Sequence, residues 1–158
     1  MKFSDFISVK AIRSDLASQD KPGVIAELVQ SLVDAGEIQA DTKADIIAAI
    51  LKREELGSTG IGRGVAVPHT KHASVDKLIG TVGVSSGGVD FSSLDAEKVQ
   101  LFFLLISPPE RPGDHLRALE SITRQLRDDT FCRFLKQARS VDDIRQLLEE
   151  ADNHQFMG

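Results

Sequence analysis

The chain of 158 residues lacks the features that mark secreted, membrane-spanning or nucleic-acid-binding proteins. It has a single cysteine, Cys132, so no internal disulfide can form. The opening MKFSDFISVK lacks the continuous apolar stretch of a signal peptide, and apolar runs such as Leu101 to Ile106 are too short to span a bilayer. The net charge of −5, with basic residues interleaved among acidic ones, supplies no field that would hold a polyanion. We therefore expect a cytoplasmic protein with no membrane insertion and no nucleic-acid partner.

The composition is that of a folded globular chain. With 41% hydrophobic and 27% charged residues, it lies far from the compositions that stay disordered. Its length is typical of one domain, and the sequence contains no internal repeat, low-complexity tract or linker. We expect one domain over residues 1–158, with a core over about 5–150 and a frayed tail over 151–158.

Two amphipathic helices are expected in the first third of the chain. The first begins at Pro22, carries apolar residues at helical spacing and ends before Gly36. The second runs from Asp41 or Thr42 to about Leu56, and Thr42 with Asp45 forms a capping-box-like pair. The pattern places on the buried face of this second helix Ala44, Ile47, Ala48 and Leu51.

Strands are expected in the middle of the chain and helices after it. The predicted strands are Val65 to Val67, Leu78 to Ser85, and Val99 to Ile106, of which the last is apolar almost throughout and therefore central. Prolines then break the chain, and Asp114 is expected to cap a helix that turns to the core Leu116, Leu119, Ile122 and Leu126. Two further helices, around Phe131 to Leu135 and from Ser140, complete an α/β fold.

Between the second helix and the first strand lies a glycine-rich segment, Gly57 to Gly64, which is expected to be a loop. It is not a P-loop, because no Lys-Ser/Thr pair follows the glycines, and its spacing does not match a dinucleotide site. What it offers is a run of backbone N–H donors and two hydroxyls that could bind an anionic group, as a nest does. The candidate phosphate contacts are Ser58, Thr59, Gly60 and Gly62.

The four histidines have different surroundings. His154 lies in the expected tail and His72 in a polar segment, which is typical of solvated surface side chains. His69 follows a glycine-rich turn, a short apolar strand and a proline, so its imidazole is expected at a fixed strand end beside backbone N–H groups. From this pattern alone, His69 is either a displayed functional group or a histidine that happens to end a strand.

Two other side chains could assist His69. His115 lies in the first turn of its expected helix, where the helix dipole favours a bound anion and a neutral imidazole that can donate one N–H. Arg53, near the end of the second helix, could supply a bidentate donor for phosphate. The alternative for both is a solvated side chain on a helix surface.

These residues together resemble a known family. The segment Arg53-Glu54-x-x-Gly57-Ser58-Thr59-Gly60-Ile61-Gly62-x-Gly64-Val65-Ala66-Val67-Pro68-His69, followed by Asp114-His115-Leu116-x-x-Leu119, looks like the signature of the type 2 IIA domains of the bacterial phosphoenolpyruvate-dependent phosphotransferase system. The resemblance extends from about Ile25 to Leu148. Within the family, the chain is most similar to the nitrogen-regulatory IIA proteins, through Arg53 to Gly62 and Asp129-x-x-Cys132-Arg133-x-Leu135.

The resemblance implies a mixed central sheet flanked by helices, as in mannitol-type IIA domains, and a phosphotransferase role. The phosphoryl acceptor would be His69, supplied by the phosphohistidine of an HPr-like carrier protein, with support from His115 and Arg53. The downstream partners would be regulatory target proteins or a IIB domain. Phosphoryl transfer requires mainly alignment and charge stabilisation, so no cofactor or metal is expected. Thr70 departs from the family, which commonly has glycine after the histidine.

Two alternatives accompany this interpretation. A metal-dependent hydrolase could use His69, His72 and His115, although no nearby carboxylate has the ligand spacing of a catalytic site. Alternatively, the chain could be the sugar-specific IIA component that passes phosphate to a IIB domain for fructose- or mannitol-type uptake. A chain with no IIB or IIC segment attached favours the regulatory role over transport.

Overall fold

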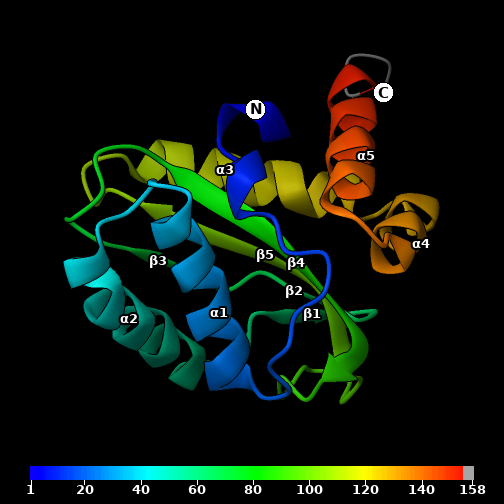
Figure 1. The fold of residues 1–158 in the computed structure, drawn as a ribbon, viewed down its shortest axis with the longest axis horizontal. Helices are drawn as coiled ribbons and strands as arrows, with labels where there is room; N and C mark the ends of the chain where they lie inside the picture. The colour runs from blue at the N-terminus through cyan, green and yellow to red at the C-terminus, as the bar shows by residue number, and fades with distance from the viewer. Residues whose placement is uncertain (155–158) are drawn as a thin grey trace.

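Strand β5 (Val99–Ser107) lies at the centre of a five-stranded mixed sheet in the computed structural model, which describes residues 1–154 (Figure 1). All of its residues except Gln100 are buried, as its apolar sequence predicts for a strand covered on both faces. Strand β4 (Ile79–Val89) pairs antiparallel with one side of β5. Strands β2 (Val65–Ala66) and β3 (His69–Lys71) both pair in parallel with its other side. Strand β1 (Gly60–Gly62) pairs antiparallel with β2. The α/β fold with a mixed sheet is confirmed.

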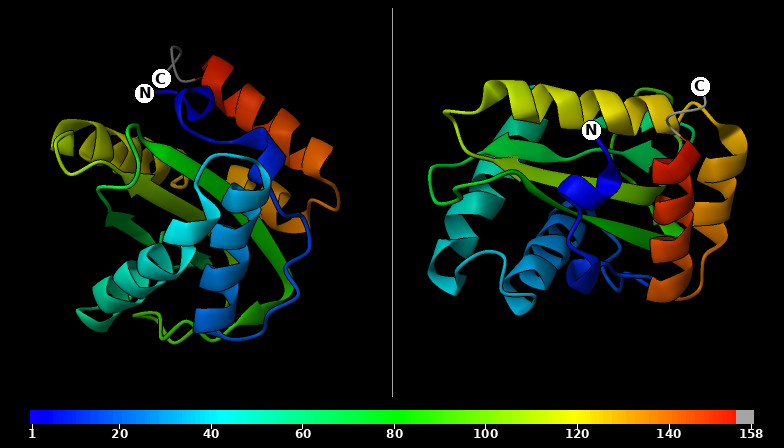
Figure 2. Two further views of the ribbon diagram at one scale, coloured as in Figure 1. Left: turned by 60° about the vertical axis from the view of Figure 1, so that its left-hand side comes forward. Right: turned by 90° about the horizontal axis from the view of Figure 1, so that it is seen from above.

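The two faces of the sheet carry separate apolar clusters. Because successive side chains of a strand point to opposite faces, Leu101, Phe103 and Leu105 pack on one side, and Phe102, Leu104 and Ile106 on the other. The first face is covered by α3 (Pro112–Gln125), α4 (Asp129–Gln137) and α5 (Val141–His154), and the second by α1 (Lys21–Asp34) and α2 (Lys43–Glu55) (Figure 2). In residues 1–154, no helix combines the length and apolarity that a bilayer crossing needs.

The chain begins with two short 3₁₀ turns (Phe3–Asp5 and Val9–Ala11) that join the core. The Phe3 ring stacks on Phe103 and Phe131, with centroids 5.6 and 6.1 Å away. Its backbone N–H donates to the carboxylate of Asp152 over 2.6 Å. The core thus starts before residue 5, and α5 continues to His154 where the sequence predicted a frayed end from residue 151; the rest of that tail, residues 155–158, lies outside the described part.

The first helix is confirmed, with Asp20 as its cap: the Asp20 carboxylate accepts the Gly23 N–H over 2.7 Å. The predicted buried face of α2 is only partly right, because Ile47 and Leu51 are partly buried against the core but do not form its centre. Ile46 and Ile50 are buried, whereas the Ala44 and Ala48 side chains are exposed. The middle of this helix is apolar on more than one face, so periodicity alone did not choose between them. The Thr42 capping box is also absent, because its hydroxyl donates to the Gln39 carbonyl instead.

Helix α3 begins earlier than its sequence predicted. Pro112 takes its first position, so Asp114 lies inside the first turn and pairs with Arg117 rather than capping. The buried stripe agrees with the prediction at Ile122 and Leu126, but at its start His115 and Ala118 are buried and Leu116 is 57% exposed. His115 thus faces the sheet, where its ring contacts Ser107 of β5.

The stability of the sheet depends on a close approach at Gly80. A Cβ atom there would lie 2.8 Å from the Leu104 carbonyl oxygen, so Gly80→Ala must displace the β4–β5 pairing. We expect its free energy of unfolding to fall by about 1–3 kcal/mol, as overpacking does. In the same strand, Gly87 has nothing within 4 Å of such a Cβ, and Gly87→Ala should be neutral or gain up to ~1 kcal/mol by restricting the unfolded chain. Urea unfolding of both variants measures this, and equal stabilities would contradict it.

Candidate functional site

His69 opens β3, directly after Pro68, and its ring is partly exposed at the sheet edge. The Nδ1 atom lies 2.8 Å from the carbonyl oxygen of Val67. A carbonyl can only accept a hydrogen bond, so the ring carries its hydrogen on Nδ1. In the neutral imidazole this leaves the lone pair on Nε2, which is therefore the nucleophilic atom.

The surroundings of His69 favour that neutral form. Burial is the largest cause and lowers the pKa of His69 below its ordinary value, while the Val67 carbonyl opposes it. Among the nearby charges, Arg53 and Lys71 lower the pKa and Glu54 raises it. The lone pair on Nε2 is consequently available at neutral pH.

His115 lies against His69. The two ring centroids are 5.2 Å apart and the rings meet edge to face at 61°. His115 is only 7% exposed, so the alternative of a solvated helix residue is wrong. Burial, followed by the charges of His69 and Lys71, lowers the pKa of His115 to about 4. Both rings of the pair are thus neutral near pH 7, which avoids repulsion between two cations.

The parallel pairing of β3 with β5 explains why distant residues meet here. His69 pairs with Leu105 and Lys71 with Ser107, so β3 and β5 stop at the same end of the sheet. Helix α3 starts a few residues after the end of β5, and its His115 lies against His69. The Ser107 hydroxyl forms a buried hydrogen bond with Nδ1 of His115. Carboxyl ends of strands are the usual place for functional groups in such sheets.

The glycine-rich segment is only partly a loop, because Gly60–Gly62 forms β1. The following turn places Gly62, Arg63 and Gly64 at φ of 94°, 57° and 77°, and its Gly64 carbonyl accepts the Leu101 N–H. His69 pairs four residues further along β5, about 13 Å away at the usual rise of a strand. The structure therefore does not bring Gly62 to His69.

The hydroxyls of Ser58 and Thr59 hold the segment in place. Ser58 Oγ donates to the Phe91 carbonyl over 2.9 Å and accepts the Gly60 N–H over 3.0 Å. The Thr59 hydroxyl and N–H both donate to the carboxylate of Glu54. Both hydroxyl hydrogens, predicted as phosphate donors, are already used within the protein.

Glu54 is a buried charged residue beside the site that sequence reasoning missed. Its side chain is buried, forms an ion pair with Lys21 Nζ at 3.2 Å and binds Thr59. The available signal was its spacing, since Glu54 continues the buried stripe of Ile46 and Ile50 at intervals of one helical turn. A carboxylate at such a position requires partners, and the glycine-rich segment provides them.

Arg53 lies beside Glu54 at the end of α2 and is partly buried. Its Nη1 donates to the Gly57 carbonyl over 2.9 Å, which fixes the guanidinium to the start of the glycine-rich segment. The charge of Arg53 acts on the pKa of His69, so the two groups are within electrostatic reach. The structure thus brings His69 and His115 into contact and places Arg53 where its charge acts on His69.

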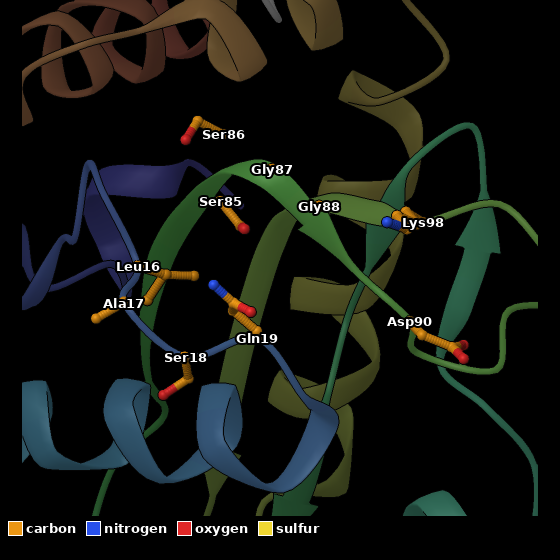
Figure 3. A pocket seen from close by; sticks show the side chains of 10 residues that line it. All are labelled: Leu16, Ala17, Ser18, Gln19, Ser85, Ser86, Gly87, Gly88, Asp90 and Lys98. Carbon is orange, nitrogen blue, oxygen red and sulfur yellow. The ribbon is translucent and has the colours of Figure 1, made fainter.

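The histidine pair does not lie in the cleft shown in Figure 3. That cleft has a volume of about 430 Å³ and separates the segment before α1 from the bend of β4. Its lining comprises Leu16, Ala17, Ser18, Gln19, Ser85, Ser86, Gly87, Gly88, Asp90 and Lys98. At the histidine pair, by contrast, the neighbouring residue Leu116 is exposed. An open site of this kind suits a macromolecular partner better than a small enclosed substrate.

His69, His72 and His115 do not form a metal-binding group in the described part of the chain. His72 Nδ1 is 2.6 Å from the Ser74 hydroxyl and accepts the Ser74 N–H. Within residues 1–154, no group of three or more His, Cys, Asp or Glu side chains is placed to hold an ion. The geometry gives no support to the metal-dependent hydrolase.

Known proteins similar to this chain agree on one family. Residues 5–151 match the family described as "Phosphoenolpyruvate-dependent sugar phosphotransferase system, EIIA 2". A nitrogen regulatory protein of Bradyrhizobium diazoefficiens is 33% identical over 148 residues, 94% of this chain and 95% of that protein. The fructose-specific EIIABC component of Bacillus subtilis is 35% identical over 96% of this chain but only 24% of its own length.

Solved structures agree with this assignment. The nitrogen regulatory protein IIA-Ntr of Neisseria meningitidis superposes with a TM-score of 0.83 at 27% identity, covering 92% of this chain and 98% of that one. The mannitol IIA structure of Escherichia coli shares the fold, with a TM-score of 0.74 at 24% identity over 89% and 97% of the two chains. The chain therefore belongs to the EIIA 2 family of the phosphoenolpyruvate-dependent sugar phosphotransferase system and is a phosphocarrier of the EIIA type.

Proposed function

We propose that this phosphocarrier accepts its phosphoryl group on Nε2 of His69, from the phosphohistidine of an HPr-like carrier protein, and serves a regulatory role. The observation that carries the proposal is the hydrogen bond from Nδ1 of His69 to the Val67 carbonyl. It leaves a lone pair on Nε2 of a ring that is partly exposed and that burial keeps neutral.

In the transfer step, the Nε2 lone pair of His69 forms a bond to phosphorus as the P–N bond of the donor breaks. The electron pair of the broken bond returns to the donor ring, so no hydrolysis occurs and no other reagent is needed. The positive charge that develops on the His69 ring is stabilised by the Val67 carbonyl, which accepts the Nδ1 hydrogen. In the onward transfer, another nucleophile forms a bond to phosphorus as the P–N bond to His69 breaks, and the electron pair returns to the His69 ring.

The charge on the phosphoryl oxygens requires donors. Transfer passes through a loose transition state with charge spread over these oxygens. In our proposal the neutral His115 ring donates one N–H, and the Arg53 guanidinium supplies the positive charge. Their supporting observations are the contact between the two rings and the effect of Arg53 on the pKa of His69.

Three of the four remaining predicted site residues take a supporting part in this proposal. Ser58, Thr59 and Gly60 fix the segment that the Arg53 side chain binds, because their hydroxyls and N–H groups are hydrogen-bonded within the protein. Glu54 fixes the same segment by accepting hydrogen bonds from Thr59. Gly62 lies at the far end of β5 and is not part of the proposed site.

A regulatory role, as opposed to sugar transport, is favoured by the relatives. Nitrogen regulatory proteins recur among the relatives and align along most of their own lengths, while fructose-specific relatives include one that aligns along 83% of its length and one that aligns along 24%. The alternative is transfer to a IIB domain. A complex of enzyme IIA-Mtl with phosphorylated enzyme IIB-Mtl from Escherichia coli has been solved, and one chain of it shares the fold of this protein.

Replacement of His69 tests the acceptor. His69→Ala should take up no phosphoryl group from phosphoenolpyruvate and the general phosphotransferase proteins of the host, because the variant has no Nε2. The matched control is His72→Ala, whose ring bonds to Ser74 and should be dispensable. Intact-protein mass spectrometry, with loss of the label in acid, measures uptake. Labelling of His69→Ala at the wild-type level would refute the assignment.

The protonation of His115 gives a test by pH. The ring should titrate near pH 4 in NMR spectra, well below the ordinary histidine value, because burial disfavours its cation. As pH falls from ~6.5 toward 4, the unfolded chain binds a proton at this residue that the folded protein does not. The free energy of unfolding should therefore decrease over this range because of His115, and His115→Gln should flatten the decrease. A His115 ring that titrates near its ordinary value would contradict the expectation.

Transfer to IIB domains separates regulation from transport. We expect the phosphorylated protein to deliver its group to a fructose- or mannitol-type IIB domain at least ~100-fold more slowly than the cognate IIA, since small misplacement of the reacting rings costs about that much. Thr70→Gly is the matched variant, because Thr70 is partly buried beside His69 where the family commonly has glycine. Rapid quench with radiolabelled protein measures the rate. Transfer as fast as that of the cognate pair would assign the chain to transport.

A further inference from the structure

Ser107 is the last residue of β5 and is completely buried. Its backbone carbonyl accepts the His72 N–H over 2.9 Å, which fixes the strand end. Its hydroxyl lies within hydrogen-bond distance of Nδ1 of His115 and has no other partner among the described residues. The side chain therefore has one contact through which it can act, and that contact is with the histidine beside His69.

The direction of this hydrogen bond follows from counting hydrogens. If Nδ1 of His115 carried the hydrogen, it would donate to the Ser107 oxygen, and the buried hydroxyl hydrogen would be left without an acceptor. If Ser107 donates to Nδ1 instead, the buried hydroxyl hydrogen and the Nδ1 lone pair satisfy each other. The neutral His115 ring then carries its own hydrogen on Nε2.

We propose that Ser107 is a positioning residue for phosphoryl transfer: by donating its hydroxyl hydrogen to Nδ1, it holds His115 in the Nε2–H tautomer that can donate to the phosphoryl oxygens. The inference rests on the proposed acceptor role of His69. In the other tautomer, Nε2 of His115 would present a lone pair to these negatively charged oxygens and would repel them.

The two histidines are thereby fixed in complementary states. A carbonyl, which only accepts, holds the hydrogen of His69 on Nδ1 and exposes a lone pair on Nε2. A hydroxyl with a single acceptor in reach leaves His115 with a hydrogen on Nε2. Rings 5.2 Å apart therefore offer one nucleophile and one donor, and neither has to exchange a proton before transfer begins.

The wild-type protein provides the first test. Long-range ¹H–¹⁵N correlation spectra at pH 7 distinguish the protonated from the unprotonated nitrogen of each ring. We expect the hydrogen on Nε2 of His115 and on Nδ1 of His69. A His115 ring with its hydrogen on Nδ1 would overturn the inference without any variant, whether or not His69 accepts phosphate.

The second test uses Ser107→Ala and a matched control. Ser107→Ala should populate the other tautomer of His115, leave that of His69 unchanged, and slow phosphorylation of His69 by roughly tenfold to 10²-fold, the loss expected for one transition-state donor. Ser107→Thr, which keeps the hydroxyl, should restore both the tautomer and the rate. The control is Ser121→Ala, which removes another buried hydroxyl of the same region, bonded to the Met1 carbonyl, without touching His115.

The outcomes separate this inference from the proposed function. A wild-type protein that is not labelled at His69 refutes the acceptor assignment. If the wild type is labelled there, a Ser107→Ala variant with an unchanged His115 tautomer and an unchanged rate overturns the role of Ser107 alone. A rate loss equal to that of Ser121→Ala, with no change of tautomer, shows a merely structural role and overturns it as well.

Discussion

The hydrogen bond from Nδ1 of His69 to the Val67 carbonyl determines what this site can do. The strand pairing around it places the two groups in contact. Strands β2 and β3 both pair in parallel with β5, and the two residues between them turn the chain without leaving that edge. Pro68 has no N–H to satisfy, while its carbonyl accepts the Leu105 N–H over 3.0 Å. The Val67 carbonyl is therefore free to bind the ring.

Burial then supplies the electrostatics. Two cationic imidazoles 5.2 Å apart would repel each other, and a cation on His69 would have no lone pair to attack phosphorus. Burial lowers the pKa of both rings, and the positive charges of Arg53 and Lys71 lower that of His69 further. The same charges that keep His69 neutral attract an incoming phosphoryl group. Rigid packing on both faces of β5 makes this arrangement available before a partner arrives.

The sequence predicted the central strand and the first helix because their apolar patterns admit one interpretation. It failed where a pattern admitted several: α2 is apolar on more than one face, and the first turns of α3 bury His115 and Ala118 while Leu116 stays exposed. The position after Pro68 left two interpretations of His69, between which the family resemblance chose, and the contact between His69 and His115 depends on parallel pairing that no local pattern encodes. The burial of Glu54 likewise depends on tertiary packing.

The Ser58 and Thr59 hydroxyls bind groups within the protein, not the phosphoryl group, and this difference from the prediction is relevant to how a carrier works. The sequence suggested them as phosphate donors, yet they bind the Phe91 carbonyl and the Glu54 carboxylate, which is itself paired with Lys21. A carrier has to release its phosphoryl group, so each extra donor to the bound group would stabilise the loaded state and slow the next transfer. With the hydroxyls committed to the fold, the proposed donors are one guanidinium and one neutral ring. They stabilise the charge in transit, and the buried carboxylate keeps the segment that holds Arg53 in a fixed place.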